Sequence, residues 1–254
     1  MRKWLTWQIR KIYFELAQNK RKMSNGIELT YILKTVSDSD SLVVVFSALS
    51  PRGKSVYNHV RSLNGIPCNR LYILDNFGYK KRGVFYLGEK NGLEVRDAVE
   101  ELIDDICRHR NIKTKIFAGS CKGGTAAIYF GLRSQASKII VGAPMYYIND
   151  CLKIKFENYR LRMIDETDPY GEDKLNGTMK NTVQGTAFQG HIYMQYSKGD
   201  EYFFSQINPF IDSLRKEKFS LITEEANYTE HQFCSFYFAK YLKKILTKET
   251  VGGL

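Results

Sequence analysis

The sequence predicts an α/β fold in which a mostly parallel sheet carries helices on both faces. Two observations support this class. Strand candidates alternate with helix candidates along the chain. Residues 42–46 (LVVVF) are apolar throughout, as in a strand that is buried on both faces. No repeat, low-complexity tract or Pro/Gly/Ser-rich linker divides the 254 residues, so a single domain over residues 27–250 is the simplest account.

The expected elements follow from local pattern. The expected strands cover residues 27–36, 42–46, 71–74, 115–117, 138–141, 191–196 and 219–223. The expected helices cover residues 93–108, 125–132, 210–216 and 232–246. Residues 150–188 break this alternation because they are polar and irregular. For this insertion two interpretations stay open, a cap over the functional site and a surface excursion without a role.

The positive charge is concentrated near the N-terminus. Residues 1–22 hold seven Lys or Arg and one Glu, and so contribute +6 to the net charge of +11. The remainder has no obvious basic stripe, which argues against a nucleic-acid partner. Apolar residues at helical spacing predict a basic amphipathic helix over residues 1–26. This helix either packs on its own domain or, through residues 1–22, binds an anionic membrane surface or another protein.

Cysteine usage and hydropathy limit the setting of the protein. The five cysteines form no CxxC pair, which argues against a disulfide framework or a structural zinc site and favours a reducing cytoplasm. We therefore expect a cytoplasmic protein with no cofactor and no metal, with peripheral association at the inner face of the membrane as the open alternative. No apolar run approaches the length of a membrane-spanning helix.

The segment 115–124 (KIFAGSCKGG) carries the most chemical information. It reads as a strand, then Gly-x-Cys-x-Gly, then a helix of small residues, which is the pattern of a nucleophile elbow. Gly119 and Gly123 occupy the two positions that must be small for strand and helix to pass closely. A nucleophilic Ser120 would put the large Lys122 at one of those positions, so Cys121 is the expected nucleophile. The segment lacks the GxxxxGK[ST] frame of a phosphate-binding loop.

The remaining catalytic groups should follow in the order nucleophile, acid, histidine. His231 lies between the last expected strand and the last expected helix, which is where such a fold places its base. His191 begins a strand, where it more readily packs or faces solvent. Asp200 follows the strand at 191–196 and is the expected acid, with Glu201 in reserve. These three groups together predict an α/β-hydrolase-like three-layer sandwich.

An oxyanion hole needs two backbone amides near the nucleophile. The amide of Lys122 follows Cys121 directly, at the start of the expected helix. The second amide should come from the loop after the strand at 42–46, and we expect it from Ser47 or Ala48.

Several of these segments resemble one protein family. They are GSCKGGTAAIYFGL, IIVGAPMYYI, HIYMQYSKGDEYFFSQINPFIDSL and YTEHQ. Together they resemble the capsular polysaccharide biosynthesis family labelled XcbB/CpsF, which is related to the acetyltransferase of the accessory Sec system. The resemblance implies a bacterial cytoplasmic protein that works beside surface-glycan assembly, with a hydrolase-type site at Cys121, Asp200 and His231. The elbow of that family usually carries serine where this chain has Cys121.

Two functions follow from these patterns. The first is an acyl-transfer enzyme, an acyltransferase or esterase, that moves an acyl group from a donor to a glycan or small-molecule acceptor through a Cys-His-Asp triad. The second is a non-catalytic, hydrolase-like accessory subunit of a capsule polymerase or export complex. Reactivity of the Cys121 thiol distinguishes them.

Overall fold

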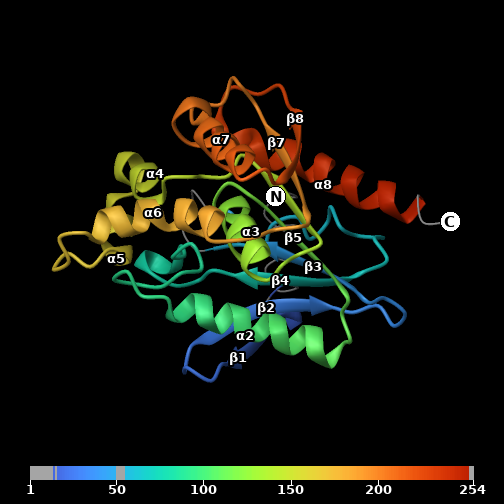
Figure 1. The fold of residues 1–254 in the computed structure, drawn as a ribbon. Helices are drawn as coiled ribbons and strands as arrows, with labels where there is room; N and C mark the ends of the chain where they lie inside the picture. Colours follow the sequence, from blue (N-terminus) through green and yellow to red (C-terminus); the bar gives the residue numbers. More distant parts are fainter. Residues whose placement is uncertain (1–13, 15, 50–54, 252–254) are drawn as a thin grey trace, which may run out of the picture.

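An eight-stranded sheet forms the centre of the molecule, as seen in a computed structural model that describes residues 14, 16–49 and 55–251 (Figure 1). The strand order is β1-β2-β4-β3-β5-β6-β7-β8. Strand β2 pairs antiparallel with β1 and β4, and the remaining neighbours pair parallel. The strands are β1 (Asn19–Lys22), β2 (Glu28–Lys34), β3 (Ser41–Phe46), β4 (Asn69–Leu74), β5 (Thr114–Ser120), β6 (Lys138–Gly142), β7 (His191–Tyr196) and β8 (Ser220–Glu225). The predicted mostly parallel sheet is confirmed.

Both faces of the sheet are covered, and each has its own apolar core. The α-helices are α2 (Glu94–His109), α3 (Lys122–Arg133), α4 (Ile148–Lys155), α5 (Glu157–Met163), α6 (Gly171–Gln184), α7 (Asn208–Lys216) and α8 (Cys234–Val251). Short turns of other helix types cover Tyr79–Lys81, Phe203–Ile207 and His231–Phe233. Helices α2, α3, α6 and α7 bury their apolar side chains in one core, and α8 packs with residues 60–68 in the other. In the part of the chain described, no helix is both long and apolar enough to cross a membrane.

Strand β3 shows why its sequence is apolar throughout. Leu42, Val44 and Phe46 belong to the core on the first face, whereas Val43 and Val45 belong to the core on the second. Successive side chains of a strand point to opposite faces, so a central strand with two covered faces needs an apolar residue at every position.

The N-terminal helix prediction is wrong over its last part. The chain from Asn19 to Lys22 is strand β1 at the edge of the sheet, and Gly26, with φ of 87°, lies in the turn that joins it to β2. Arg21 forms an ion pair with Asp105 of α2, and Lys20 lies 3.7 Å from Glu28. Part of the basic charge therefore belongs to an edge strand, while the predicted helical positions 1–13 lie outside the described residues.

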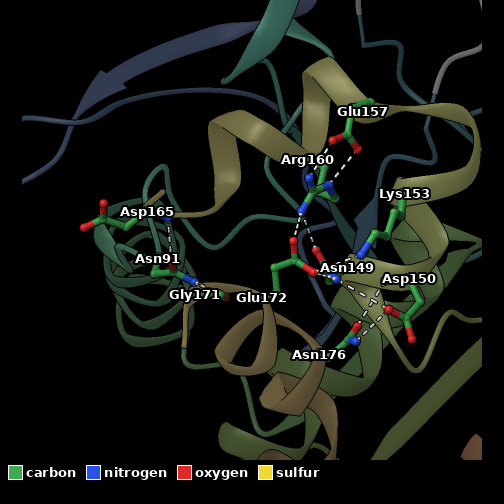
Figure 2. Close-up of polar contacts among 10 residues, drawn as sticks. All are labelled: Asn91, Asn149, Asp150, Lys153, Glu157, Arg160, Asp165, Gly171, Glu172 and Asn176. Atoms are coloured by element: carbon green, nitrogen blue, oxygen red, sulfur yellow. Dashed lines mark hydrogen bonds and ion pairs between the residues drawn. The ribbon is translucent and has the colours of Figure 1, made fainter. Parts of the chain in front are cut away.

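The insertion at 150–188 is mostly helical rather than irregular. Helices α4, α5 and α6 lie together at the left of Figure 1, and α6 buries Leu175, Met179 and Val183, which are spaced four residues apart. Figure 2 shows the buried Arg160 among the polar contacts between these helices, bound to Glu157, Glu172 and Asn149. The sequence is polar here because these helices bury only a narrow apolar stripe and are joined by polar side chains.

Candidate active site

Cys121 occupies a strained turn between β5 and α3. Its backbone angles are φ 53° and ψ −126°, a conformation that a residue with a side chain rarely adopts. The Cys121 amide donates to the Gly142 carbonyl over 2.9 Å, and its carbonyl accepts the amides of Gly124 and Thr125 over 2.9 and 3.0 Å. Three backbone hydrogen bonds thus hold the turn in the shape of a nucleophile elbow.

The two glycines beside the elbow are required by space. A Cβ atom on Gly119 would lie 2.3 Å from the Gly123 carbonyl oxygen, and one on Gly123 would lie 2.4 Å from the Phe46 carbonyl oxygen. Real Cβ atoms essentially never come within 3.0 Å of another atom. The close passage of β5, α3 and the end of β3 therefore excludes any side chain at either position.

Ser120, the rejected nucleophile, is fully buried in a separate environment. Its hydroxyl lies 3.3 Å from Nε2 of His59, whose ring packs edge-on against Phe238. Burial lowers the pKa of His59 to about 4, so this imidazole is neutral near pH 7. The sequence contains no signal that His59 lies near the elbow, because the loop with His59 precedes β4 and carries no motif.

The structure brings His231 and Asp200 to the elbow. Nδ1 of His231 lies 2.9 Å from Oδ2 of Asp200, and the imidazole is close enough to Cys121 for each group to shift the pKa of the other. Because Nδ1 faces the carboxylate, Nε2 is the nitrogen available to the thiol. The Tyr202 amide donates to Oδ1 of Asp200 over 2.9 Å, and the Tyr202 ring stands edge-on to the imidazole at 5.0 Å. The Tyr202 amide thus holds the carboxylate oxygen of Asp200 that does not contact His231.

Glu201, the reserve acid, and His191, the less favoured histidine, lie elsewhere. Glu201 is exposed and pairs with Lys155 over 2.9 Å, so it does not contact His231. His191 is exposed at the start of β7, and its Nδ1 lies 2.8 Å from the Ser220 hydroxyl. Of these carboxylates and imidazoles, Asp200 and His231 are the two that contact each other.

The site favours a charged pair of thiolate and imidazolium. Burial alone would raise the pKa of Cys121, but the charge and hydrogen bond of His231 outweigh it and hold this pKa below its usual range. Burial likewise opposes the cation on His231, but the Cys121 charge and the hydrogen bond to Asp200 raise the pKa of His231 above its usual range. The N-terminus of α3 adds a favourable dipole for an anion at Cys121.

Hydrogen bonds from the backbone amides of Lys122 and Leu49 help to lower the pKa of Cys121. The amides of Ser47 and Ala48, the two residues expected to supply the second oxyanion donor, have other partners. The Ser47 amide donates to the Tyr86 hydroxyl over 2.6 Å, and the Ala48 amide donates to Oδ1 of Asn58 over 2.8 Å.

Two further cysteines surround the site. Cys151 of α4 packs with Met145, Tyr202 and Cys121, and burial together with the Cys121 charge raises the pKa of Cys151 to about 12. The sulfur of Cys234 lies 3.9 Å from Nε2 of His231, and burial raises its pKa as well. No motif in the sequence marks either cysteine as a neighbour of the elbow. Within the described ranges, no three His, Cys, Asp or Glu residues gather as a metal site.

The comparisons with known proteins bear on the fold. No family model matches this chain, and no curated protein matches it. The capsule O-acetyltransferase of Neisseria meningitidis serogroup A superposes with a TM-score of 0.73 at 17% identity, covering 92% of this chain and 99% of that chain. A chain of the glycosylation-associated protein complex Gap123 from Streptococcus agalactiae gives a TM-score of 0.77 at 17% identity, and the superposition covers 94% of this chain and 47% of that chain.

Serine hydrolases share the same architecture. The fluorophosphonate-binding serine hydrolase FphF of Staphylococcus aureus superposes with a TM-score of 0.66 at 14% identity, covering 91% of this chain and 96% of that chain. Such low identities concern the fold and leave the reaction open. The chain thus has the α/β-hydrolase-like three-layer fold that these acetyltransferases and hydrolases share.

Proposed function

We propose that the protein is an acyl-transfer enzyme in which Cys121 is the nucleophile, His231 the general base and acid, and Asp200 the group that orients the imidazole. One observation carries this proposal. Cys121 lies at a strained strand-to-helix turn, the charge of His231 lowers its pKa, and His231 is in turn hydrogen-bonded to Asp200. Nucleophile, base and orienting acid in this order are the arrangement used for acyl transfer.

The reaction has two halves in this proposal. The Cys121 thiolate attacks the carbonyl carbon of the donor, and the amides of Lys122 and Leu49 bind the oxyanion of the tetrahedral intermediate. The intermediate collapses to a thioester on Cys121, and the imidazolium of His231 gives its proton to the leaving group. In the second half, His231 takes the proton of an acceptor hydroxyl, which attacks the thioester and releases the Cys121 thiolate. Asp200 holds Nδ1 of His231 throughout.

The substrate classes rest on the resemblance and on the structural neighbours. A capsule O-acetyltransferase is among these neighbours, and one of its structures is in complex with CoA. We therefore propose a thioester or ester as donor, a hydroxyl of a surface or capsular polysaccharide as acceptor, and a cytoplasmic place beside its assembly, as in the XcbB/CpsF family. Cys151 packs against Cys121 from α4, which favours the interpretation of the insertion as one wall of the site.

The test is loss of activity on removal of the thiol. The purified Cys121→Ala variant should lose hydrolysis of p-nitrophenyl acetate and acetyl transfer from acetyl-CoA to capsular polysaccharide. Cys107→Ala is the matched control, because Cys107 is also partly exposed but lies on α2 and has a pKa raised by burial. Full activity of Cys121→Ala on both substrates would refute the proposal.

The accessory-subunit function has a separate signature. The structural similarity to a chain of the Gap123 complex supports this alternative, because that protein is part of an assembly. It predicts a Cys121 that is inert toward iodoacetamide at neutral pH, because a subunit without catalysis needs no activated thiol. Rapid and selective alkylation of Cys121 would instead favour the enzyme.

A further inference from the structure

The residue after the proposed nucleophile, Lys122, takes part in a buried ion pair. Nζ of Lys122 donates to Oδ2 of Asp75 over 2.7 Å, and both side chains are 0% exposed. Removing two charges from water is costly, and replacing such a pair by apolar residues of similar size is often neutral or stabilising for a fold. Stability alone therefore gives a weak reason for this pair, which stands beside the nucleophile.

The pair is held at a fixed place by the backbone around it. The Asp75 carboxylate also accepts the amides of Val84 and Tyr86, over 2.9 and 3.1 Å. Gly83, with φ of 110°, packs so closely on the pair that a Cβ there would overlap both Asp75 and Lys122. The position of the ammonium group is therefore determined by three segments, β4, α3 and the loop at 83–86.

A short series of hydrogen bonds connects this loop to the loop that carries Leu49. The Tyr86 hydroxyl donates its single proton to the Ile73 carbonyl over 2.9 Å. Its oxygen therefore accepts both the Ser47 amide, over 2.6 Å, and the Ser47 hydroxyl, over 2.8 Å. Ser47 is fully engaged at a point two residues before Leu49.

Lys122, the cation of the ion pair, also carries the other proposed oxyanion donor in its own backbone amide. The Lys122 amide approaches the Cys121 sulfur, while its side chain runs back to Asp75 and lies 5.0 Å from the Tyr86 ring centre. A single buried contact thus connects to both proposed oxyanion donors, directly through Lys122 and indirectly through Tyr86 and Ser47. Oxyanion stabilisation depends on donors that are held in place before the charge develops.

We propose that the Lys122–Asp75 ion pair positions the amides of Lys122 and Leu49 for the oxyanion, which makes both side chains positioning residues for acyl transfer. This inference rests on the proposed function. It assigns to the Lys122 side chain a role separate from that of its backbone amide.

The primary test replaces the pair without leaving an uncompensated buried charge. The Lys122→Met/Asp75→Asn double variant keeps the approximate shapes and removes both charges. Its kcat for p-nitrophenyl acetate should fall by roughly 30-fold or more, given that losing one oxyanion donor costs about 10²–10³-fold. Its KM should stay within about threefold of the wild-type value, because the other contacts of the protein with the acyl donor remain.

A second readout separates positioning from general damage. Alkylation of Cys121 by iodoacetamide expels iodide from a saturated carbon and forms no oxyanion. Its rate at saturating pH should stay within about twofold of wild type in the double variant, because the thiolate itself is retained. The control Lys174→Met/Asp168→Asn removes a Lys–Asp pair with an exposed lysine on α6, and it should leave both rates within about twofold.

Tyr86→Phe provides an independent variant if the double variant does not fold. It removes only the hydroxyl that holds Ser47, and kcat should fall by about 10-fold while the alkylation rate is kept. Unchanged kcat in either variant, or equal losses of kcat and alkylation, would overturn the inference. Activity retained by Cys121→Ala would instead refute the proposed function, so the two failures are distinct.

Discussion

The replacement Gly123→Ala places one methyl group where α3 passes the end of β3. The new Cβ would lie 2.4 Å from the Phe46 carbonyl oxygen, 3.0 Å from its carbonyl carbon and 3.1 Å from the carbonyl carbon of Ser47. Relief requires a shift of at least about 0.6 Å toward the 3.0 Å limit of real Cβ contacts. All three atoms are backbone, and β3 is held between β4 and β5, so no side chain can rotate away.

Two costs follow from this overlap. Overpacking of this kind destabilises proteins by about 1–3 kcal/mol, whereas the better helix propensity of alanine returns at most about 1 kcal/mol. The melting temperature should therefore fall by roughly 2–8 °C for a chain of this size. The Leu49 amide lies three residues beyond Phe46, and misplacement of a catalytic group by about 1 Å can cost about 10²-fold, so kcat should fall by roughly 10–100-fold.

The assay combines thermal unfolding with hydrolysis of p-nitrophenyl acetate. Gly177→Ala is the matched control, because Gly177 lies inside α6 and a Cβ there would meet only the Asn181 side chain, at 3.4 Å. This control should melt at or slightly above the wild-type temperature, because alanine adds up to about 1 kcal/mol to the free energy of unfolding. Its kcat should be unchanged. A Gly123→Ala protein that melts no lower than wild type and keeps its kcat within twofold would refute the steric argument.

Three further outcomes are expected. Asp200→Asn should lower kcat by about 10²-fold or more, since an amide cannot stabilise the imidazolium of His231. Steady-state kinetics on p-nitrophenyl acetate measure this loss, and a wild-type kcat would contradict the prediction. The rate of Cys121 alkylation by iodoacetamide should reach half its maximum at a lower pH than for an ordinary thiol, because His231 holds the thiol pKa below its usual range; a half-maximal rate near about pH 8.5 would show an unperturbed thiol. Arg160→Met should destabilise the protein by about 1–2 kcal/mol in urea unfolding, because Asn149 and Glu172 lose their shared partner; an unchanged midpoint would assign no stabilising role to that contact.

The fold was largely predictable because its strands are short, apolar and separated by clear helical periodicity. The elbow was predictable for a local steric reason, since only Gly119 and Gly123 permit the close passage that the turn requires. The positions of Asp200 and His231 followed from chain order, which a parallel sheet converts into proximity at the carboxyl ends of its strands.

What could not be predicted depends on contacts between distant segments. The proposed second amide is that of Leu49, since Tyr86 and Asn58 engage the two amides before it, and no local pattern connects those residues to the loop after β3. Local pattern does not identify the edge strand β1, although Ser24-Asn25-Gly26 is a hairpin-turn signal. The reason is that its residues continue the basic sequence before it, whose apolar positions have helical spacing. Helix α6 was missed because its apolar stripe is only one residue wide.

Strand β1 also affects how the molecule meets copies of itself. Among the strands of the described residues it ends the sheet, and it exposes all four of its side chains, Asn19, Lys20, Arg21 and Lys22. An unpaired strand edge is a template for continuing a sheet into another chain. Juxtaposing two such edges would bring six cationic side chains together, so their mutual repulsion disfavours aggregation by strand addition at this border.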